Sequence, residues 1–170
     1  MKKLMAMALM AMVFTLTMNA QKFAFVDTDY ILKNIPSYEA AQDEINNLSE
    51  TWEEEIAQEY QAIEEMYKSY KSERVLLSEE MREKKEQEII EKEKAVKELQ
   101  QKYFGAEGDL FQKREELVKP IQDAIYKAVK EMTAEGGYAI IFDTASGAAI
   151  LYSNPRYDKS DEILQKMGYK

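Results

Sequence analysis

One stretch of this chain limits its possible folds more than any other, because residues 37–72 contain neither proline nor glycine. Its nonpolar and aromatic side chains recur about every 3.6 residues, which is the period of one face of an α-helix. These side chains are Ala41, Ile45, Leu48, Trp52, Ile56, Tyr60, Ile63, Tyr67 and Tyr70. Such a helix would be roughly 54 Å long. A small compact domain cannot bury it along its whole length, so the sequence predicts an extended helical arm.

A second helical pattern follows after a short interruption and covers residues 79–133. Val-Leu-Leu at 75–77 breaks the first pattern, and Ser78 is a residue type that caps helices well. Two long helices separated by so few residues must fold back on each other antiparallel. The sequence therefore predicts a helical hairpin arm over residues 37–133, with its tip near 73–78.

Short segments typical of β-strands flank this hairpin. Residues 22–26, 138–143 and 148–153 are rich in nonpolar side chains, and Ser146-Gly147 supplies a turn between the last two. Ser160 is suited to cap a final short helix. The expected fold class is therefore α+β, mainly α: a long antiparallel helical hairpin on a small β-body.

The β-body is expected to comprise residues 21–36 and 134–170. Because three short strands make a marginal sheet, we expect the sheet to be completed between subunits, which would also bury its edges. The body is therefore predicted to be the oligomerisation region. The side chains expected in this contact are Phe23, Phe25, Ile140, Phe142, Ile150 and Tyr152.

The N-terminus is typical of a secretory signal peptide. Lys2 and Lys3 give a positive start, residues 4–18 are uncharged and mostly nonpolar, and Ala20 is a small residue suited to a cleavage site. We expect residues 1–20 to be removed during export. A retained membrane anchor is the alternative, because the uncharged run is nearly long enough to span a bilayer.

The composition removes several classes of function. The chain has no cysteine and no histidine, so thiol nucleophiles, imidazole bases and the commonest zinc ligands are missing. No glycine loop for binding phosphates is found, so we expect no cofactor, no metal and no enzymatic activity. The formal net charge of −9 argues against nucleic acid as a partner, since binding the phosphate backbone needs a cationic surface.

Several motifs stand in a particular order along the chain. They are Phe23-Ala-Phe-Val-Asp27, Leu77-Ser-Glu-Glu80 at the hairpin turn, Pro120-Ile121, Ile140-Ile-Phe-Asp143 and Ile150-Leu-Tyr152. In this order the chain resembles the Skp/OmpH family of periplasmic chaperones. The resemblance implies a homotrimer with an intersubunit β-barrel body, and arms enclosing a cavity that holds unfolded outer-membrane β-barrel proteins without ATP. The alternative is a structural coiled-coil scaffold or spacer of the cell envelope.

The charge of the arm departs from the well-known members of this family, which are basic. Between Lys33 and Lys68 there is no lysine or arginine, whereas residues 37–66 hold ten acidic side chains. Folding about residue 75 would set Glu53–Glu55 near Lys94 and Lys97. The arm is then either a partly self-neutralised solvated hairpin or a wall that favours basic client segments. Transient contact with a membrane or lipid surface is kept as a further partner, although the acidic chain does not support it.

Partly exposed aromatic and nonpolar residues of the arm are candidates for client contact, since weak contacts at many points suit the binding of unfolded chains. The candidates are Trp52, Tyr60, Tyr67, Tyr70, Val75, Leu76, Leu77, Tyr103 and Phe104. The alternative for the aromatic residues is a role in the hairpin core. The alternative for the three tip residues is packing on one another and on Met81.

Gly105 and Gly108 lie inside the second helical pattern, where each costs about 1 kcal/mol relative to alanine. We predict a hinge of the arm at this point, which would let the cavity fit clients of different sizes. The alternative is that the glycines allow close packing against a tryptophan or tyrosine ring.

Overall fold

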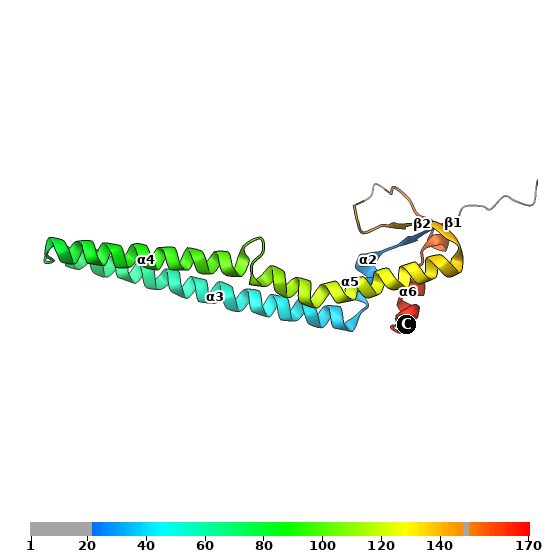
Figure 1. Cartoon of the computed structure of the whole chain (residues 1–170), viewed down its shortest axis with the longest axis horizontal. Helices are drawn as coiled ribbons and strands as arrows, with labels where there is room; N and C mark the ends of the chain where they lie inside the picture. The colour runs from blue at the N-terminus through cyan, green and yellow to red at the C-terminus, as the bar shows by residue number, and fades with distance from the viewer. Residues whose placement is uncertain (1–21, 148–149) are drawn as a thin grey trace, which may run out of the picture. The chain divides into compact units, whose positions relative to one another are not determined.

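The structure is a computed structural model that describes residues 22–147 and 150–170 (Figure 1). The predicted signal peptide, residues 1–20, lies outside the described residues. Contacts divide the chain into two compact units. The arm unit comprises residues 32–125, and the body unit comprises the described residues up to Ile31 together with residues 126–170. The elements in chain order are β1 (Lys22–Val26), α2 (Thr28–Lys33), α3 (Pro36–Glu73), α4 (Glu79–Phe104), α5 (Asp109–Gly136), β2 (Tyr138–Asp143), η2 (Pro155–Tyr157) and α6 (Ser160–Lys166).

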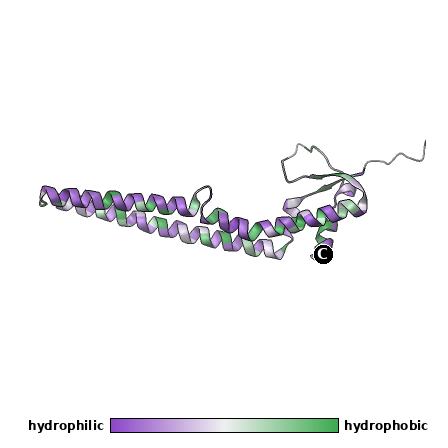
Figure 2. Cartoon of the chain, viewed as in Figure 1, coloured by the Kyte–Doolittle hydropathy of each residue, from purple (hydrophilic) through white to green (hydrophobic). Residues whose placement is uncertain are grey.

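Helix α3 confirms the long helix predicted from the nonpolar periodicity. It begins with Pro36 in its first turn, where the missing N–H has no helical partner to lose. Its buried residues are Ala41, Ile45, Ile56 and Ile63, all members of the predicted stripe. Figure 2 shows how hydrophilic residues cover most of the arm helices, with hydrophobic residues in spaced patches along them.

Helices α3 and α4 form the predicted antiparallel hairpin. Their shared core is a narrow seam of four buried side chains, Ile56, Ile63, Ile89 and Val96, which we call the arm seam. The loop between the helices, residues 74–78, coincides with the predicted tip, and the Ser78 hydroxyl accepts a hydrogen bond from the Met81 N–H at 3.4 Å. The seam and the tip together establish the long helical hairpin of the expected fold class.

The ion pairs across the hairpin reveal its register. Lys85 lies 2.7 Å from Glu73, and Lys92 pairs with Glu59. Lys94, which was expected near Glu53–Glu55, instead lies 3.7 Å from Glu98 of its own helix. Glu55 instead accepts a hydrogen bond from Tyr103 at 3.0 Å, several residues further along the return helix than the predicted partners Lys94 and Lys97, so this predicted pairing is wrong.

The return helix is interrupted, so the prediction of one helix over residues 79–133 is wrong. Helix α4 ends at Phe104 and α5 begins at Asp109. The intervening loop is tight: a Cβ on Gly105 would lie 2.3 Å from the Gln101 carbonyl oxygen, and one on Gly108 would lie 2.7 Å from the Lys102 carbonyl oxygen. The glycines therefore permit a backbone approach that no other residue type allows, while their low helix propensity favours the interruption.

The sheet of the body unit contains two strands, β1 and β2, which run parallel. The strands predicted at 22–26 and 138–143 are confirmed. The third predicted strand, 148–153, is wrong over residues 150–153, which have no strand structure, and residues 148–149 lie outside the described residues. Leu151 is fully exposed there. A strand needs a neighbour for its backbone hydrogen bonds, and the described part of the chain offers none to this segment.

Polar side chains fasten the ends of the two strands to the nearby helices. Asp27 caps α2 by accepting a hydrogen bond from the Tyr30 N–H at 2.9 Å. Asp143 accepts hydrogen bonds from the Thr28 N–H at 3.2 Å and from its hydroxyl at 2.8 Å. Asp143 thus joins the end of β2 to the start of α2, and this structural role accounts for a carboxylate at that position.

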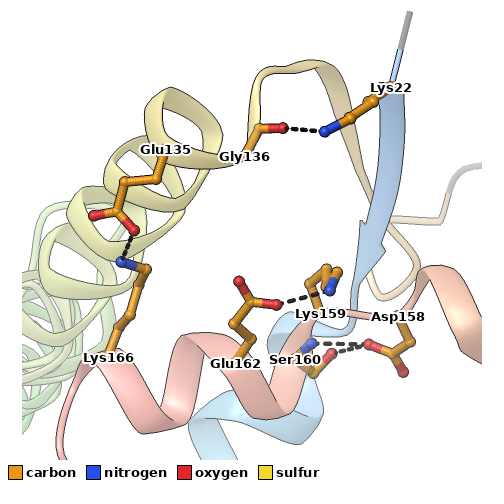
Figure 3. A network of polar contacts seen from close by, with 8 residues as sticks. All are labelled: Lys22, Glu135, Gly136, Asp158, Lys159, Ser160, Glu162 and Lys166. Carbon is orange, nitrogen blue, oxygen red and sulfur yellow. Dashed lines mark hydrogen bonds and ion pairs between the residues drawn. The ribbon is translucent and has the colours of Figure 1, made fainter. Parts of the chain in front are cut away.

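Ser160 has a different role from the predicted helix cap. It is the first residue of α6, and its N–H donates to the Asp158 carboxylate at 2.9 Å, so Asp158 supplies the capping oxygen. The Ser160 hydroxyl also donates to Asp158 at 2.6 Å (Figure 3). It accepts from the Asp27 N–H at 2.8 Å. The reason is burial: Ser160 is 2% exposed, so its hydroxyl must find partners inside the unit.

Adjacent isoleucines of α4 allow a matched test of the arm seam. Ile89 is 3% exposed and belongs to the seam, whereas Ile90 is 54% exposed. Replacing Ile89 by alanine removes buried methyl groups and leaves a cavity, so we expect the free energy of unfolding to fall by about 2–4 kcal/mol. The control, Ile90→Ala, should change it by less than about 0.5 kcal/mol. Urea denaturation followed by circular dichroism measures both, and equal losses would contradict the register described above.

Candidate functional site

An aromatic cluster lies where the return helix is interrupted. The ring of Trp52 on α3 stacks on Tyr103 of α4, with ring centres 4.7 Å apart and planes within 7°. Phe104 meets Trp52 edge-on at 6.3 Å. All three residues are partly buried, and Tyr103 and Phe104 pack against the arm seam. The cluster therefore belongs to the hairpin interface and keeps part of each ring accessible.

Three tyrosine hydroxyls of the arm are held by carboxylates on the opposite helix. Tyr103 donates to Glu55 at 3.0 Å, Tyr67 donates to Glu93 at 3.0 Å, and Tyr70 donates to Glu86. These hydrogen bonds raise the pKa of all three phenols, because a carboxylate stabilises the protonated hydroxyl and disfavours a second negative charge beside it. Tyr60 and Tyr67 remain 43% and 46% exposed, so both present ring surface to solvent.

The arm tip exposes two nonpolar side chains. Val75 is 83% exposed and Leu76 is 85% exposed, while Leu77 is partly buried. The predicted alternative of packing on Met81 does not hold for Val75 and Leu76, because both side chains are themselves more than 80% exposed. Polar contacts close the loop instead: the Arg82 guanidinium donates to the Arg74 carbonyl at 3.0 Å, and Lys85 donates to Glu73.

One face of the body sheet is nonpolar and accessible. In the parallel register Phe23 pairs with Ile140, and Phe25 pairs with Phe142. Paired residues of neighbouring strands project to the same face, and the Phe25 and Phe142 rings stack with centres 5.6 Å apart. Phe23, Ile140 and Phe142 are 47%, 54% and 41% exposed, whereas Ala24 of β1 is fully buried. We call these four paired residues the open sheet face.

The register thus brings together four of the six side chains predicted for the oligomerisation contact. The remaining two, Ile150 and Tyr152, lie in the irregular segment after β2, with Ile150 partly buried and Tyr152 78% exposed. Sequence reasoning missed the carboxylates that hold the arm tyrosines, because the correct partners depend on the hairpin register. The signal that could have indicated these hydrogen bonds was the large number of glutamates on each helix of the hairpin opposite the tyrosines of the other.

Two further features are absent from residues 22–147 and 150–170. No group of three or more histidine, cysteine, aspartate or glutamate side chains is arranged to hold a metal ion in these ranges. Among the same residues, no helix combines the length and the nonpolar character that crossing a bilayer requires.

Comparison with known proteins identifies the family. The model of the family described as outer membrane protein (OmpH-like) matches residues 22–167, and the chain therefore belongs to the OmpH-like family. The resemblance noted in the sequence is confirmed. An uncharacterized protein of Aquifex aeolicus is 29% identical over 145 residues, covering 85% of each chain.

A solved structure shares the fold. It belongs to a Caulobacter crescentus protein described as a candidate outer membrane chaperone (OmpH-like). The TM-score is 0.68 over 85% of this chain and 82% of that chain, with 10% sequence identity. At this identity the likeness establishes the architecture of the chain, and the predicted fold class is confirmed by it.

The Tyr103–Glu55 hydrogen bond has a consequence for alkaline pH. Because the pKa of Tyr103 is raised in the folded arm, the stability that the bond contributes is complete below pH 10 and is lost as the pH rises through the folded-state pKa. Glu55→Gln should therefore shift the ionisation of Tyr103 to lower pH. The measurement is the absorbance at 295 nm during an alkaline titration.

Subtracting the titration of Tyr103→Phe from that of the parent protein isolates the Tyr103 signal from the other tyrosines. The same subtraction in the Glu55→Gln background gives the shifted midpoint. Identical midpoints in the two backgrounds would show that Glu55 does not hold the Tyr103 hydroxyl in solution.

Proposed function

We propose that this protein is an exported, ATP-independent holding chaperone of the periplasm, which binds unfolded outer-membrane β-barrel proteins between helical arms and keeps them from aggregating. Two findings support this proposal: membership of the OmpH-like family, and a fold shared with a candidate outer membrane chaperone. The observation that carries it is the nonpolar surface of the arm, which is spread over separate places rather than gathered in one deep pocket.

This distribution suits an unfolded client. Large hydrophobic side chains at least 43% exposed occur along the arm unit at Tyr60, Tyr67, Val75, Leu76, Met81, Ile90 and Phe111. Each offers a shallow contact, and several used together give a high overall affinity with easy release at any one point. A client of variable sequence can therefore be held without a defined binding motif.

The open sheet face supports assembly into a homotrimer. Phe23, Phe25, Ile140 and Phe142 form a nonpolar surface on a sheet of only two strands, which is marginal by itself. Closure into an intersubunit β-barrel would cover this face and remove the free strand edges. In this proposal Ile150 and Tyr152 join the barrel, because a neighbouring subunit provides the strand partner that their own chain does not.

The acidic outgoing helix bears on client choice. Within the arm unit, Glu44 pairs with Lys113 at 3.2 Å and Glu59 pairs with Lys92, so part of the charge is neutralised inside the hairpin. Glu50, Glu53 and Glu54 are exposed on α3. We infer that the arm attracts basic client segments and that this attraction weakens as salt screens it.

The interruption at residues 105–108 supports the proposed hinge. Helix α3 is continuous beside this loop, so at residues 105–108 the arm consists of one helix and a loop instead of two helices. The atoms nearest to a Cβ at Gly105 or Gly108 all belong to residues 101–105, so the glycines do not serve close packing against an aromatic ring. Bending is easiest where one helix stands alone.

Aggregation of an unfolded client tests the proposed function. Urea-unfolded outer-membrane β-barrel protein is diluted into the mature chaperone, and light scattering and native mass spectrometry are recorded. We expect suppressed aggregation and one client bound by three chains. A folded trimer that leaves the client to aggregate would overturn the holding function and favour a structural spacer of the envelope.

A variant of the arm tip refines this experiment. Val75→Ser/Leu76→Ser removes two side chains more than 80% exposed, so the fold should be retained while client affinity falls several-fold. The matched control is Glu80→Ser, which alters a neighbouring exposed position without removing nonpolar surface. If Val75→Ser/Leu76→Ser and the control Glu80→Ser bind the client with equal affinity, the tip does not contact the client.

The hinge is tested by distances within one chain. The natural sequence has no cysteine, so cysteines introduced at Ser72 and Glu116 can be spin-labelled uniquely, with labelled chains diluted among unlabelled ones. Gly105→Ala/Gly108→Ala destabilises the tight loop and favours continuous helix, so the distance distribution should narrow. Glu107→Ala, which leaves both glycines in place, should keep the parent width. An unchanged width in the double variant would overturn the hinge.

A further inference from the structure

A hollow lies between helices α3 and α4 of the arm unit. Its volume is about 280 Å³, near the lower end of the roughly 300–1,000 Å³ typical of small-molecule sites, so it suits one long side chain. We call it the arm hollow, and its lining residues are Glu65, Met66, Ser69, Tyr70, Lys85, Glu88 and Ile89. None of them belongs to the open sheet face, which the proposed assembly covers.

The floor of the arm hollow is nonpolar. Ile89 is 3% exposed and belongs to the arm seam, while Met66 and Tyr70 are partly buried and pack against the seam. Long charged side chains bury their aliphatic stems along such surfaces and keep the charged end near water. The floor therefore suits the stem of a long side chain, and the Tyr70 ring offers a face to a flat group.

The side-chain donors in the lining are bonded to carboxylates outside it. The Ser69 hydroxyl donates to Glu73 at 2.8 Å, and the Lys85 ammonium donates to the same carboxylate at 2.7 Å. The Tyr70 hydroxyl donates to Glu86. An anion entering the hollow would have to compete with a carboxylate for each of these donors, so the lining does not favour an anionic ligand.

Two carboxylates of the lining remain uncommitted, one on each helix. Glu65 of α3 and Glu88 of α4 are exposed, and in the described part of the chain neither takes part in an ion pair or a side-chain hydrogen bond. Ionised carboxylates are acceptors only, so they call for a positively charged donor. A divalent metal ion is less suitable than an organic cation, because it needs more oxygen ligands than two carboxylates supply.

The hollow also favours one kind of basic side chain. A guanidinium is planar and weakly hydrated, and its five N–H donors can reach carboxylates on two sides while its face lies against an aromatic ring. A lysine ammonium is more strongly hydrated and has no flat face. The pairing of Glu65 and Glu88 with the Tyr70 ring therefore matches arginine better than lysine.

We propose that the arm hollow binds an arginine side chain of an unfolded client, with Glu65 and Glu88 holding the guanidinium and Met66, Tyr70 and Ile89 contacting its stem. This site rests on the proposed holding function, which supplies an unfolded chain as the ligand. It names arginine as the residue that the distal arm selects within a basic client segment.

Methionine methyl groups report on the arm hollow directly. Residues 21–170 contain four methionines, and Met66 alone among them lines the hollow, so the other three serve as references. The mature protein, labelled with ¹³C at these methyl groups, is titrated with unstructured peptides that differ only at the central residue: arginine, lysine, citrulline or glutamate. We expect the Met66 signal to shift with the arginine peptide. That peptide should bind about tenfold more tightly than the citrulline peptide, whose side chain has a similar shape without the charge.

Single substitutions separate the hollow from the overall acidity of the arm. Glu65→Gln and Glu88→Gln should each weaken binding of the arginine peptide about threefold. The matched control is Glu83→Gln, an exposed α4 position outside the lining, which changes the net charge equally and should leave binding unchanged. An equal loss in all three variants, or equal affinity for the arginine and citrulline peptides, would overturn the proposal.

Client aggregation, measured by light scattering on the same protein, distinguishes failure of this site from failure of the holding function. Suppressed aggregation without a Met66 shift for any peptide would overturn the arginine site and leave the holding function in place. An arginine-specific Met66 shift without suppressed aggregation would support the site and contradict the holding function.

Discussion

The parallel pairing of β1 with β2 is the interaction on which the body unit depends, because it joins two segments separated by the whole length of the hairpin. Once Phe23 is opposite Ile140, the alternation of side chains along each strand fixes which face every remaining residue of β1 and β2 occupies. Ala24 and Val26 become buried, and the Phe25 and Phe142 rings become neighbours on the opposite face. A shift of one residue would bury the phenylalanines and expose the small core side chains.

The arm unit follows a different physical rule. Two helices share a single interface, so each can bury one narrow stripe while the rest of its surface stays in water. Isoleucine and valine fill the arm seam, and tyrosines stand beside it with their hydroxyls on carboxylates of the opposite helix. Exposed ring and aliphatic surface is therefore a direct consequence of building an arm from two helices, and the proposed holding function makes use of it.

Much of this architecture follows from local patterns. The stripe from Ala41 to Tyr70 predicted α3 to within one or two residues, and Ser78 marked the start of α4 correctly. The return helix was predicted as continuous because its nonpolar periodicity carries on through Gly105 and Gly108. The tight backbone approach that interrupts it depends on carbonyl positions that periodicity does not reveal.

The sequence by itself determined the helical hairpin, its tip, two of the strands and the family, because these depend on residue type, short spacings and the order of motifs. The tertiary structure alone decided which residues meet across long separations. It set the hairpin register that pairs Lys85 with Glu73, placed Ser160 between Asp27 and Asp158, and joined Thr28 to Asp143. Such contacts arise from the packing of distant segments, where a displacement of one residue changes every partner.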